Sequence, residues 1–229
     1  MIGLIGAMQP EVEDLIARLE DPVREEIGGT VYFGGRLEGK NVLIARCGIG
    51  KVCAAACAQT MIVHFGADRI INTGVAGALD PALSIGDVVA ADALVQHDMD
   101  TTALGDPPGL ISALGEVTMP TDETLRAAAE QAARDSGVTV RRGIIATGDR
   151  FVCRREDKEN IRRAFGAVCC EMEGGAVAQV CRMNGVPFAV LRAVSDTADE
   201  RSVVDYPTFM RSAAATMATV VRRSLARLP

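Results

Sequence analysis

Short apolar runs alternate with segments of helical periodicity along the chain, and this alternation constrains the fold more than any other feature. The spacing of Val12, Leu15, Ile16 and Leu19, for example, is that of an amphipathic helix. Strands are predicted at 1–8, 31–33, 41–47, 69–73, 87–95, 142–146, 167–172 and 187–194. Helices are predicted from Pro10, over 51–65, from Thr121 or Asp122 to Arg134, over 157–165, over 175–183, and from Pro207 onward. Such an order is typical of a mostly parallel sheet covered on both faces.

The composition is that of a soluble protein and argues against several kinds of partner. The 229 residues are 48% hydrophobic and 24% charged, which suits one α/β domain over residues 1–229. A net charge of -6 without a basic stripe argues against nucleic acid or an anionic membrane as a partner. We find neither a signal-peptide pattern nor an apolar run long enough to span a bilayer, so a cytoplasmic location is expected.

The cysteines and histidines do not form a recognisable metal or disulfide pattern. There are seven cysteines, no C-x2-C pair and two histidines, so neither a disulfide scaffold nor a zinc site is expected. The segment HDMD at 97–100 has poor spacing for metal ligation. Most cysteines lie in apolar stretches and are expected to be buried thiols: Cys53, Cys57, Cys169, Cys170 and Cys181.

Three acidic residues each follow a predicted strand. Glu11 follows the first strand, Glu173 follows 167–172, and Asp196 follows 187–194. In open α/β sheets, ligands bind outside the carboxyl ends of the strands. If these strands are parallel, all three carboxylates face one crevice.

Each carboxylate also has a simpler interpretation, and spacing alone leaves both open. Asp196 is either a turn or cap residue, or a partly buried acid that donates a proton with Ser195 orienting it. Glu11 either interacts with the dipole at the start of a helix or acts as a general base for water. Glu173 is either a solvated charge at a strand end or an acceptor for a vicinal diol such as ribose. In EMEGGAVA, Glu171 and Glu173 are expected to point the same way from one strand.

The glycine-rich segments match no nucleotide-binding fingerprint. GLIG at 3–6 is not the dinucleotide motif, and CGIGK at 47–51 lacks the first glycine and the Ser/Thr of a P-loop. NTGVAGAL at 72–79 is expected to be a strand followed by a tight turn of small residues. The backbone N–H groups of that turn could meet a ligand.

Seven motifs, in this order, resemble the family of 5'-methylthioadenosine/S-adenosylhomocysteine nucleosidases: GLIGAMQPEVE, GIGKV, INTGVAGAL, IGDVV, ATGDRFV, EMEGGAVAQVC and LRAVSDTAD. The resemblance runs from residue 1 to about residue 215. It implies a single-domain α/β nucleoside phosphorylase-like fold, with a central mixed, partly barrel-like sheet flanked by helices. It also implies a homodimer that needs no cofactor or metal and that hydrolyses the N-glycosidic bond of both nucleosides, releasing adenine.

The same resemblance suggests roles for the carboxylates. Glu11 would activate the attacking water, Glu173 would hold the ribose hydroxyls, and Asp196 would protonate adenine N7 so that the base leaves neutral. The other residues expected at the substrate are Ile49, Val75, Ala76, Gly77, Phe151, Val152, Met172, Arg192, Ser195, Tyr206 and Phe209.

Several of these have a more specific expected contact. Phe151 would stack on the purine, and the backbone of Val152 would read the edge of the base. Tyr206 would cover the ribose and the 5' side, while Ile49 and Phe209 would line the apolar part of the pocket. Met172 would join Glu173 at the ribose, Arg192 would lie near Glu11, and Ser195 would support Asp196.

The chain also departs from the family pattern. Val75 stands where many members have serine, Tyr206 stands where phenylalanine is frequent, and the loop 103–119 has no aromatic residue. In relatives, aromatic residues of this loop cross the dimer to cover the 5'-alkylthio group. The expected replacements are Leu104, Pro107, Leu110 and Ile111, followed by Met119. Preference between the two substrates therefore stays open.

Three alternatives remain beside this hypothesis. A purine nucleoside phosphorylase would need a positive cradle for phosphate, whereas TGVAGAL is neutral and Glu11 would repel a dianion. An aminodeoxyfutalosine hydrolase would share the adenine and ribose contacts but bind a different 5' group. A non-catalytic nucleoside-binding module would have no chemical need for all three carboxylates.

Overall fold

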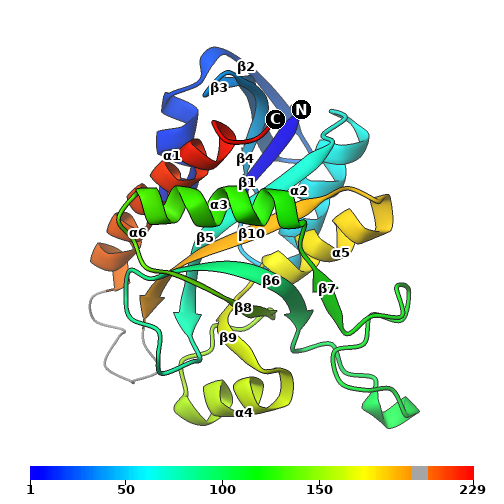
Figure 1. The fold of residues 1–229 in the computed structure, drawn as a ribbon. Coiled ribbons are helices and arrows are strands. Elements are labelled where there is room, and N and C mark those ends of the chain that lie inside the picture. Colours follow the sequence, from blue (N-terminus) through cyan, green and yellow to red (C-terminus); the bar gives the residue numbers. More distant parts are fainter. Residues whose placement is uncertain (197–205) are drawn as a thin grey trace.

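The computed structural model describes the backbone of residues 1–196 and 206–229 and the side chains of residues 1–196 and 210–229. Strands and helices alternate along the chain, and the helices surround the strands (Figure 1). The strands are β1 (Ile2–Gly6), β2 (Glu20–Ile27), β3 (Thr30–Leu37), β4 (Lys40–Arg46), β5 (Arg69–Ala78), β6 (Val88–Gln96), β7 (Thr118–Pro120), β8 (Val140–Thr147), β9 (Ala167–Glu171) and β10 (Phe188–Asp196). The helices are α1 (Gln9–Ala17), α2 (Lys51–Val63), the 3-10 turn η1 (Thr102–Leu104), α3 (Glu123–Asp135), α4 (Arg155–Phe165), α5 (Gly174–Asn184) and α6 (Tyr206–Leu225).

A closed ring of five strands lies at one end of the sheet. The strand order is β10-β6-β8-β9-β5-β1-β4-β3-β2, with β7 added to β6, and β10 also pairs with β5. The ring β10-β6-β8-β9-β5 is therefore a small barrel, and the sheet continues from β5 into an open wing of β1, β4, β3 and β2. This mixed, partly barrel-like sheet confirms the predicted fold class.

The expectation of a mostly parallel sheet is wrong, because antiparallel pairs are as frequent as parallel ones. The pairs β1–β4, β1–β5, β5–β10, β6–β8 and β8–β9 are parallel. The antiparallel pairs come from the hairpins β2–β3–β4, the addition of β7 to β6, and the two contacts that close the barrel, β5–β9 and β6–β10.

Helices cover the two faces of the sheet in separate groups. Leu4 of β1 lies in a core formed with α1, α3 and α6, whereas its neighbour Ile5 lies in the core formed with α2 and α5. Successive strand residues point to opposite faces, so both faces of β1 are buried. Helix α4 is placed apart from both groups, at the lower end of the barrel beside β9 (Figure 1). None of the helices in the described residues has the length and apolar character needed to cross a bilayer.

Two strands are longer than the sequence indicated, and both lead to the site described below. The expected tight turn within 72–79 is wrong, because β5 continues through both glycines to Ala78 and is held there by β10 and β9. Strand β10 likewise continues past Val194 to Asp196, with a bulge between these two residues. Strand β2 was missed because its residues are charged and exposed and carry no apolar alternation. Cys53 is exposed, contrary to the expectation of a buried thiol, because it lies on the outer side of α2.

Candidate active site

A pocket lies where β1, β5, β9 and β10 end. Most residues predicted from the sequence line it: Glu11, Ile49, Val75, Ala76, Gly77, Phe151, Met172, Glu173, Ser195 and Asp196. Ala7, Met8, Cys170 and Glu171 line it as well. Val152 lines an adjoining small recess with Phe151 and Asp196.

The other predicted residues lie elsewhere. Arg192 is buried behind the pocket wall at 1% exposure. Leu104, Pro107 and Leu110 belong to the segment between β6 and β7, which projects from the body of the molecule (Figure 1). None of the three is among the residues that line this pocket. The side chains of Tyr206 and Phe209 lie outside the described residues. Ile111 and Met119 are buried in the core of their own chain, so the expectation that they reach a partner subunit is wrong.

The three carboxylates converge for a reason other than the one expected. Strand β9 runs antiparallel to β5, with Gly77 opposite Cys170 and Ala78 opposite Cys169. The chain that leaves β9 therefore turns back along β5 and brings Glu173 into the pocket from the opposite direction to Glu11 and Asp196. Closure of the barrel, rather than a shared strand direction, brings the three side chains together.

Glu11 is held by backbone amides at the start of α1. Its Oε2 accepts hydrogen bonds from the N–H groups of Ala7 (2.7 Å) and Met8 (2.9 Å), and its Oε1 accepts one from Val75 (3.2 Å). Burial raises the pKa of this carboxyl, while the charge of Arg192 and the three amides act in the opposite direction. A buried carboxylate in fixed orientation with a raised pKa is suited to accept a proton.

Asp196 lies at the end of β10 and is held by two donors. Ser195 Oγ donates to its Oδ1 (3.1 Å), and Lys158 Nζ of α4 donates to its Oδ2 (3.0 Å). Asp196 and Lys158 are both buried, with side-chain exposures of 8% and 3%. Lys158 was not predicted from the sequence. However, it precedes Ile161 and Phe165 by three and seven residues, which places it on the apolar face of α4.

Two glycines of β5 allow these carboxylates to lie against the strand. A Cβ at Gly74 would lie 2.6 Å from Glu11 Oε1, and a Cβ at Gly77 would lie 3.0 Å from Asp196 Oδ2. At roughly 3.3 Å per strand residue, the two carboxylates are placed about 10 Å apart along β5. The pocket between them is lined by Val75 and Ala76.

Glu171 and Glu173 do not point the same way, contrary to the prediction, because the strand ends at Glu171 and the chain turns into α5. Glu171 accepts hydrogen bonds from Arg192 Nη2, from Thr147 Oγ1, and from the N–H groups of residues 173 and 174. Glu173 turns toward the pocket and accepts a hydrogen bond from Gly50 N (2.9 Å). Gly50 has φ of 99°, in the region that favours glycine, so the GIGK motif here supplies an amide that holds Glu173.

Electrostatics distinguish these two glutamates. Burial, and then the neighbouring charge of Glu171, raises the pKa of Glu173 to about 7, against an opposing effect of Arg192. The Arg192 guanidinium also donates to Asn72 Oδ1 (2.6 Å). Arg192, Asn72 and Thr147 therefore support the pocket from behind. Of these, the isolated charge of Arg192 in the apolar strand FAVLRAVSD carried the clearest signal in the sequence.

Asp98 of the HDMD segment connects two neighbouring loops. Asp98 accepts hydrogen bonds from Lys51 Nζ (2.7 Å) and from Asp149 N (2.9 Å). Within the described part of the chain, no group of three or more His, Cys, Asp or Glu side chains is arranged to hold a metal ion.

Comparison with known proteins places this pocket in a family. The sequence model of the phosphorylase superfamily matches residues 1–226. The 5'-methylthioadenosine/S-adenosylhomocysteine nucleosidase of Shewanella loihica is 42% identical over 211 residues, covering 91% of each chain. The chain belongs to the 5'-methylthioadenosine/S-adenosylhomocysteine nucleosidase family of the phosphorylase superfamily.

Two further relatives show how far the likeness extends. The crystal structure of the Neisseria meningitidis nucleosidase in complex with methylthio-immucillin-A has a TM-score of 0.95 and 38% identity, with 99% of both chains covered. An aminodeoxyfutalosine nucleosidase of Campylobacter jejuni is 39% identical over 99% of both chains. The nucleosidase fold therefore extends over the whole length of this chain, and its relatives act on more than one adenine nucleoside.

Proposed function

We propose that this protein hydrolyses the N-glycosidic bond of 5'-methylthioadenosine and S-adenosylhomocysteine and releases adenine and the thioribose product. The reaction would serve methionine salvage and clearance of S-adenosylhomocysteine. Residues 1–229 would act as one domain in the cytoplasm. The family membership supports the reaction type, and the pocket supports the assignment of roles.

The observation that carries the mechanism is the placement of Glu11 and Asp196 against Gly74 and Gly77 of β5. A separation of about 10 Å leaves room for a ribosyl bond between a base on one side and an acid on the other. Glu11 takes a proton from water as the water oxygen attacks C1'. The C1'–N9 bonding electrons pass to adenine, and N7 receives a proton delivered through Asp196, so that neutral adenine leaves.

The transition state of such a reaction carries positive charge on the ribose. Glu173 and Met172 would contact the ribose hydroxyls, and Glu11, with Arg192 behind the wall, would face C1'. Carboxylates placed around a developing cation stabilise it more than they stabilise the ground state. Ser195 would hold Asp196, as its hydrogen bond to Oδ1 indicates.

The base and the 5' group would be bound by the more open side of the pocket. Phe151, with 57% exposure, would stack on the purine, and Val152 would read its edge. Val75, Ala76 and Gly77 would form the floor below the nucleoside, and Ile49 would contribute apolar surface. Tyr206 and Phe209 are proposed to cover the ribose and to line the apolar side on the strength of the family resemblance alone.

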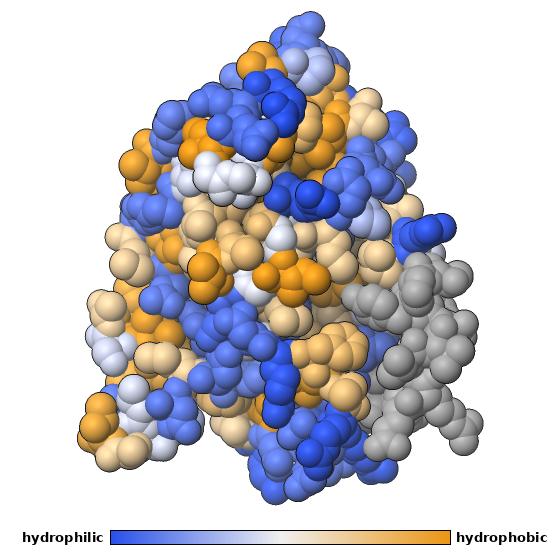
Figure 2. All heavy atoms as spheres, turned by 180° about the vertical axis from the view of Figure 1, so that it is seen from behind, coloured by the Kyte–Doolittle hydropathy of each residue, from blue (hydrophilic) through white to orange (hydrophobic). Residues whose placement is uncertain are grey.

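A second copy of the chain would complete the 5' pocket. Leu104 is 83% exposed on the projecting segment, and Ile49 at the pocket is 58% exposed. Figure 2 shows apolar residues gathered in the middle of the face opposite to that of Figure 1, while polar residues cover the lower end. We therefore propose a homodimer in which Leu104, Pro107 and Leu110 of one protomer cover the 5' group bound by the other.

Charge favours water over phosphate as the nucleophile. The described residues lining the pocket include Glu11, Glu171, Glu173 and Asp196 but no lysine or arginine. Phosphate recognition normally depends on such cations. The Arg192 guanidinium is already engaged by Glu171 and Asn72, so it does not offer a phosphate cradle.

Aminodeoxyfutalosine hydrolysis is the second candidate, favoured by the likeness to the Campylobacter jejuni nucleosidase. The adenine and ribose contacts would be the same. The aromatic-free segment between β6 and β7 would decide which 5' group is accepted.

The test is adenine release from 5'-methylthioadenosine, S-adenosylhomocysteine, aminodeoxyfutalosine and adenosine, with and without phosphate, by the wild type and Asp196→Asn. Phosphate-independent release that falls by about 10²–10⁴ in the variant is expected, since general acid help has that magnitude. Release only with phosphate would identify a phosphorylase. No release from any of the four by folded protein would favour a non-catalytic nucleoside-binding module.

A further inference from the structure

Asp196 has a buried ammonium group, that of Lys158, beside the carboxylate oxygen that Ser195 does not contact. Lys158 Nζ lies 3.0 Å from Asp196 Oδ2, and the side chains of Lys158 and Asp196 are 3% and 8% exposed. Lys158 comes from α4, a helix that packs on β8 and β9, and neither Lys158 nor any other α4 residue is among the described residues that line the pocket. A buried lysine beside a carboxylate is costly unless the two are paired, so this contact is a built feature of the site.

The ion pair bears on which group supplies the proton that adenine N7 receives. In a lysine–aspartate ion pair the proton is on the nitrogen, and a carboxylate has no proton to donate to adenine N7. Ser195 donates to the other oxygen, Oδ1, and Gly77 presents only backbone. Of these two donors, the Lys158 ammonium is the one that can release its proton, because a serine hydroxyl is a far weaker acid.

We propose that Lys158 supplies the proton that Asp196 passes to the leaving adenine. The proposal rests on the nucleosidase function and on Asp196 as the acid. An Nζ–H bond of Lys158 breaks and an O–H bond forms on Asp196, which leaves Lys158 as a neutral amine. As the C1'–N9 bond breaks, its electron pair passes to the base, the new O–H bond breaks, and an N7–H bond forms, so that Asp196 is again a carboxylate. Lys158 itself does not touch the substrate and acts only through Asp196.

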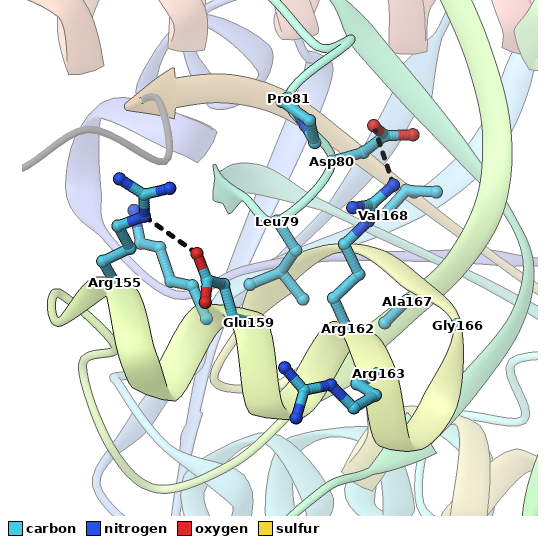
Figure 3. A pocket seen from close by; sticks show the side chains of 11 residues that line it. Leu79, Asp80, Pro81, Arg155, Glu159, Arg162, Arg163, Gly166, Ala167 and Val168 are labelled. Atoms are coloured by element: carbon cyan, nitrogen blue, oxygen red, sulfur yellow. Dashed lines mark hydrogen bonds and ion pairs between the residues drawn. The ribbon is translucent and has the colours of Figure 1, made fainter.

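A cavity that Lys158 helps to line offers the route by which this lysine regains a proton. This cavity of about 770 Å³ lies between α4, the start of β9 and the segment after β5 (Figure 3). Lys158 is among the residues that line it. Arg155 and Arg162 line it as well and are paired with Glu159 and Asp80 (Figure 3). Solvent that enters this cavity returns a proton to the Lys158 amine without passing through the occupied nucleoside pocket.

Other charged groups face the pair from the surrounding elements. The Cys170 thiol of β9 interacts with both Asp196 and Lys158, and the same thiol interacts with Glu171 of β9 and with Arg150 from the segment before α4. Burial raises the pKa of the Cys170 thiol to about 12, so it is not a proton donor at neutral pH. Arg150 cannot release a proton in a protein. Among these neighbours, only Lys158 is both in contact with Asp196 and able to give up a proton.

The test compares Lys158→Met, Lys158→Arg and Lys40→Met in the full-length protein. Arginine keeps the positive charge and a donor but does not deprotonate, so it separates proton delivery from charge. Lys40→Met makes the same chemical change at the first residue of β4, which is not among the residues that line the pocket. Each protein is assayed with 5'-methylthioadenosine and with a 4-nitrophenyl 5-methylthioriboside, whose leaving group departs as a stable anion without protonation.

Both Lys158 variants are expected to lower kcat for 5'-methylthioadenosine roughly 10²-fold, with KM changed by less than about threefold. Hydrolysis of the nitrophenyl riboside is expected to stay at the wild-type rate, and Lys40→Met is expected to behave as wild type. A Lys158→Arg variant that retains kcat would overturn the proposal and leave Lys158 with a charge role only. Equal losses on both substrates would also overturn it, because they would indicate a structural role. If the wild type itself releases no adenine, the failure lies in the proposed function instead.

Discussion

Two buried cations lie on different sides of the pocket, and they differ in what they hold. Arg192 of β10 lies behind the ribose side, in contact with Glu171 and 4.0 Å from Glu173 Oε2. Lys158 of α4 lies behind the base side and contacts Asp196. Counted over the whole residue, Arg192 is 1% exposed and Lys158 is 2% exposed, and burial of these charges is tolerated because each has a carboxylate partner.

The chemistry of the two cations matches the chemistry required on each side. Arginine keeps its proton in proteins, so Arg192 provides a permanent charge that makes a cluster of buried glutamates tolerable. Carboxylates outnumber the cation there, which suits a substrate that becomes positive at the ribose. Lysine can lose its proton, and the base side is where a proton is needed. In the proposed mechanism, the pocket therefore combines fixed electrostatics at one end with proton transfer at the other.

The largest expected effect is that of Glu11→Gln, which removes the proposed base on the ribose side. The rate of adenine release should fall about 10²–10⁴-fold with KM little changed, since general base help has this magnitude. Steady-state kinetics with 5'-methylthioadenosine measure it, and Glu13→Gln on the exposed side of α1 is the matched control. A fully active Glu11→Gln protein would move the role of the base to Glu173.

Arg192→Met tests whether the permanent charge holds the glutamate cluster. Removing one partner of a buried ion pair leaves uncompensated charge, so the free energy of unfolding should fall by about 3–5 kcal/mol at neutral pH. Urea unfolding measures this loss. Arg222→Met, which breaks the partly exposed pair with Glu38, should cost less than about 1 kcal/mol. Equal losses for the two variants would show that Arg192 is not needed to compensate the glutamates.

The raised pKa of Glu173 predicts a pH-dependent stability on the ribose side. Its pKa is about 7 in the folded protein and 4.5 when unperturbed, so the folded state binds the proton more tightly. Wild-type stability should therefore fall as pH rises from about 4.5 through about 7, by at most about 3 kcal/mol from this group. In Glu173→Gln this part of the pH dependence should be absent, whereas Glu156→Gln on the exposed side of α4 should retain it.

The parts of the structure that the sequence predicted were those with local signals. Apolar runs and helix periodicity placed most strands and helices, and Asp122 caps α3 as expected, accepting a hydrogen bond from Leu125 N (2.8 Å). Strand β2 has no such signal, because an exposed edge strand of charged residues is stabilised by pairing with β3 rather than by burial. Closure of the barrel depends on pairing between β5 and β10, residues more than a hundred positions apart, which no local pattern encodes.

The residues of the site were likewise predicted where a local motif marked them and missed where only the folded structure brings them in. Glu11, Glu173 and Asp196 were predicted because each follows a strand in a motif that resembles a known family. The partners behind them, Lys158 and Asn72, come from other elements and meet the site only after the barrel closes. The prediction for Glu171 was wrong because strand alternation was assumed across a residue, Met172, at which the strand has already ended.

The smallest effect is expected for Ser195→Ala, which tests the base side without touching its charges. Ser195 Oγ donates to Asp196 Oδ1 (3.1 Å) and lies 3.3 Å from the carbonyl oxygen of Ala76, so its loss frees one oxygen of the acid but leaves Lys158 on the other. A single hydrogen bond of this kind contributes about 1 kcal/mol, which corresponds to a roughly fivefold loss in kcat. Kinetics on Ser195→Ala, Lys158→Met and the double variant would measure the coupling between the two donors. Because Lys158 supplies the proton and Ser195 only orients its acceptor, the serine change should matter little once the lysine is gone. Additive losses in kcat would show instead that the two donors act independently. Lys158 would then provide only a permanent charge at Asp196, as Arg192 does at the glutamates.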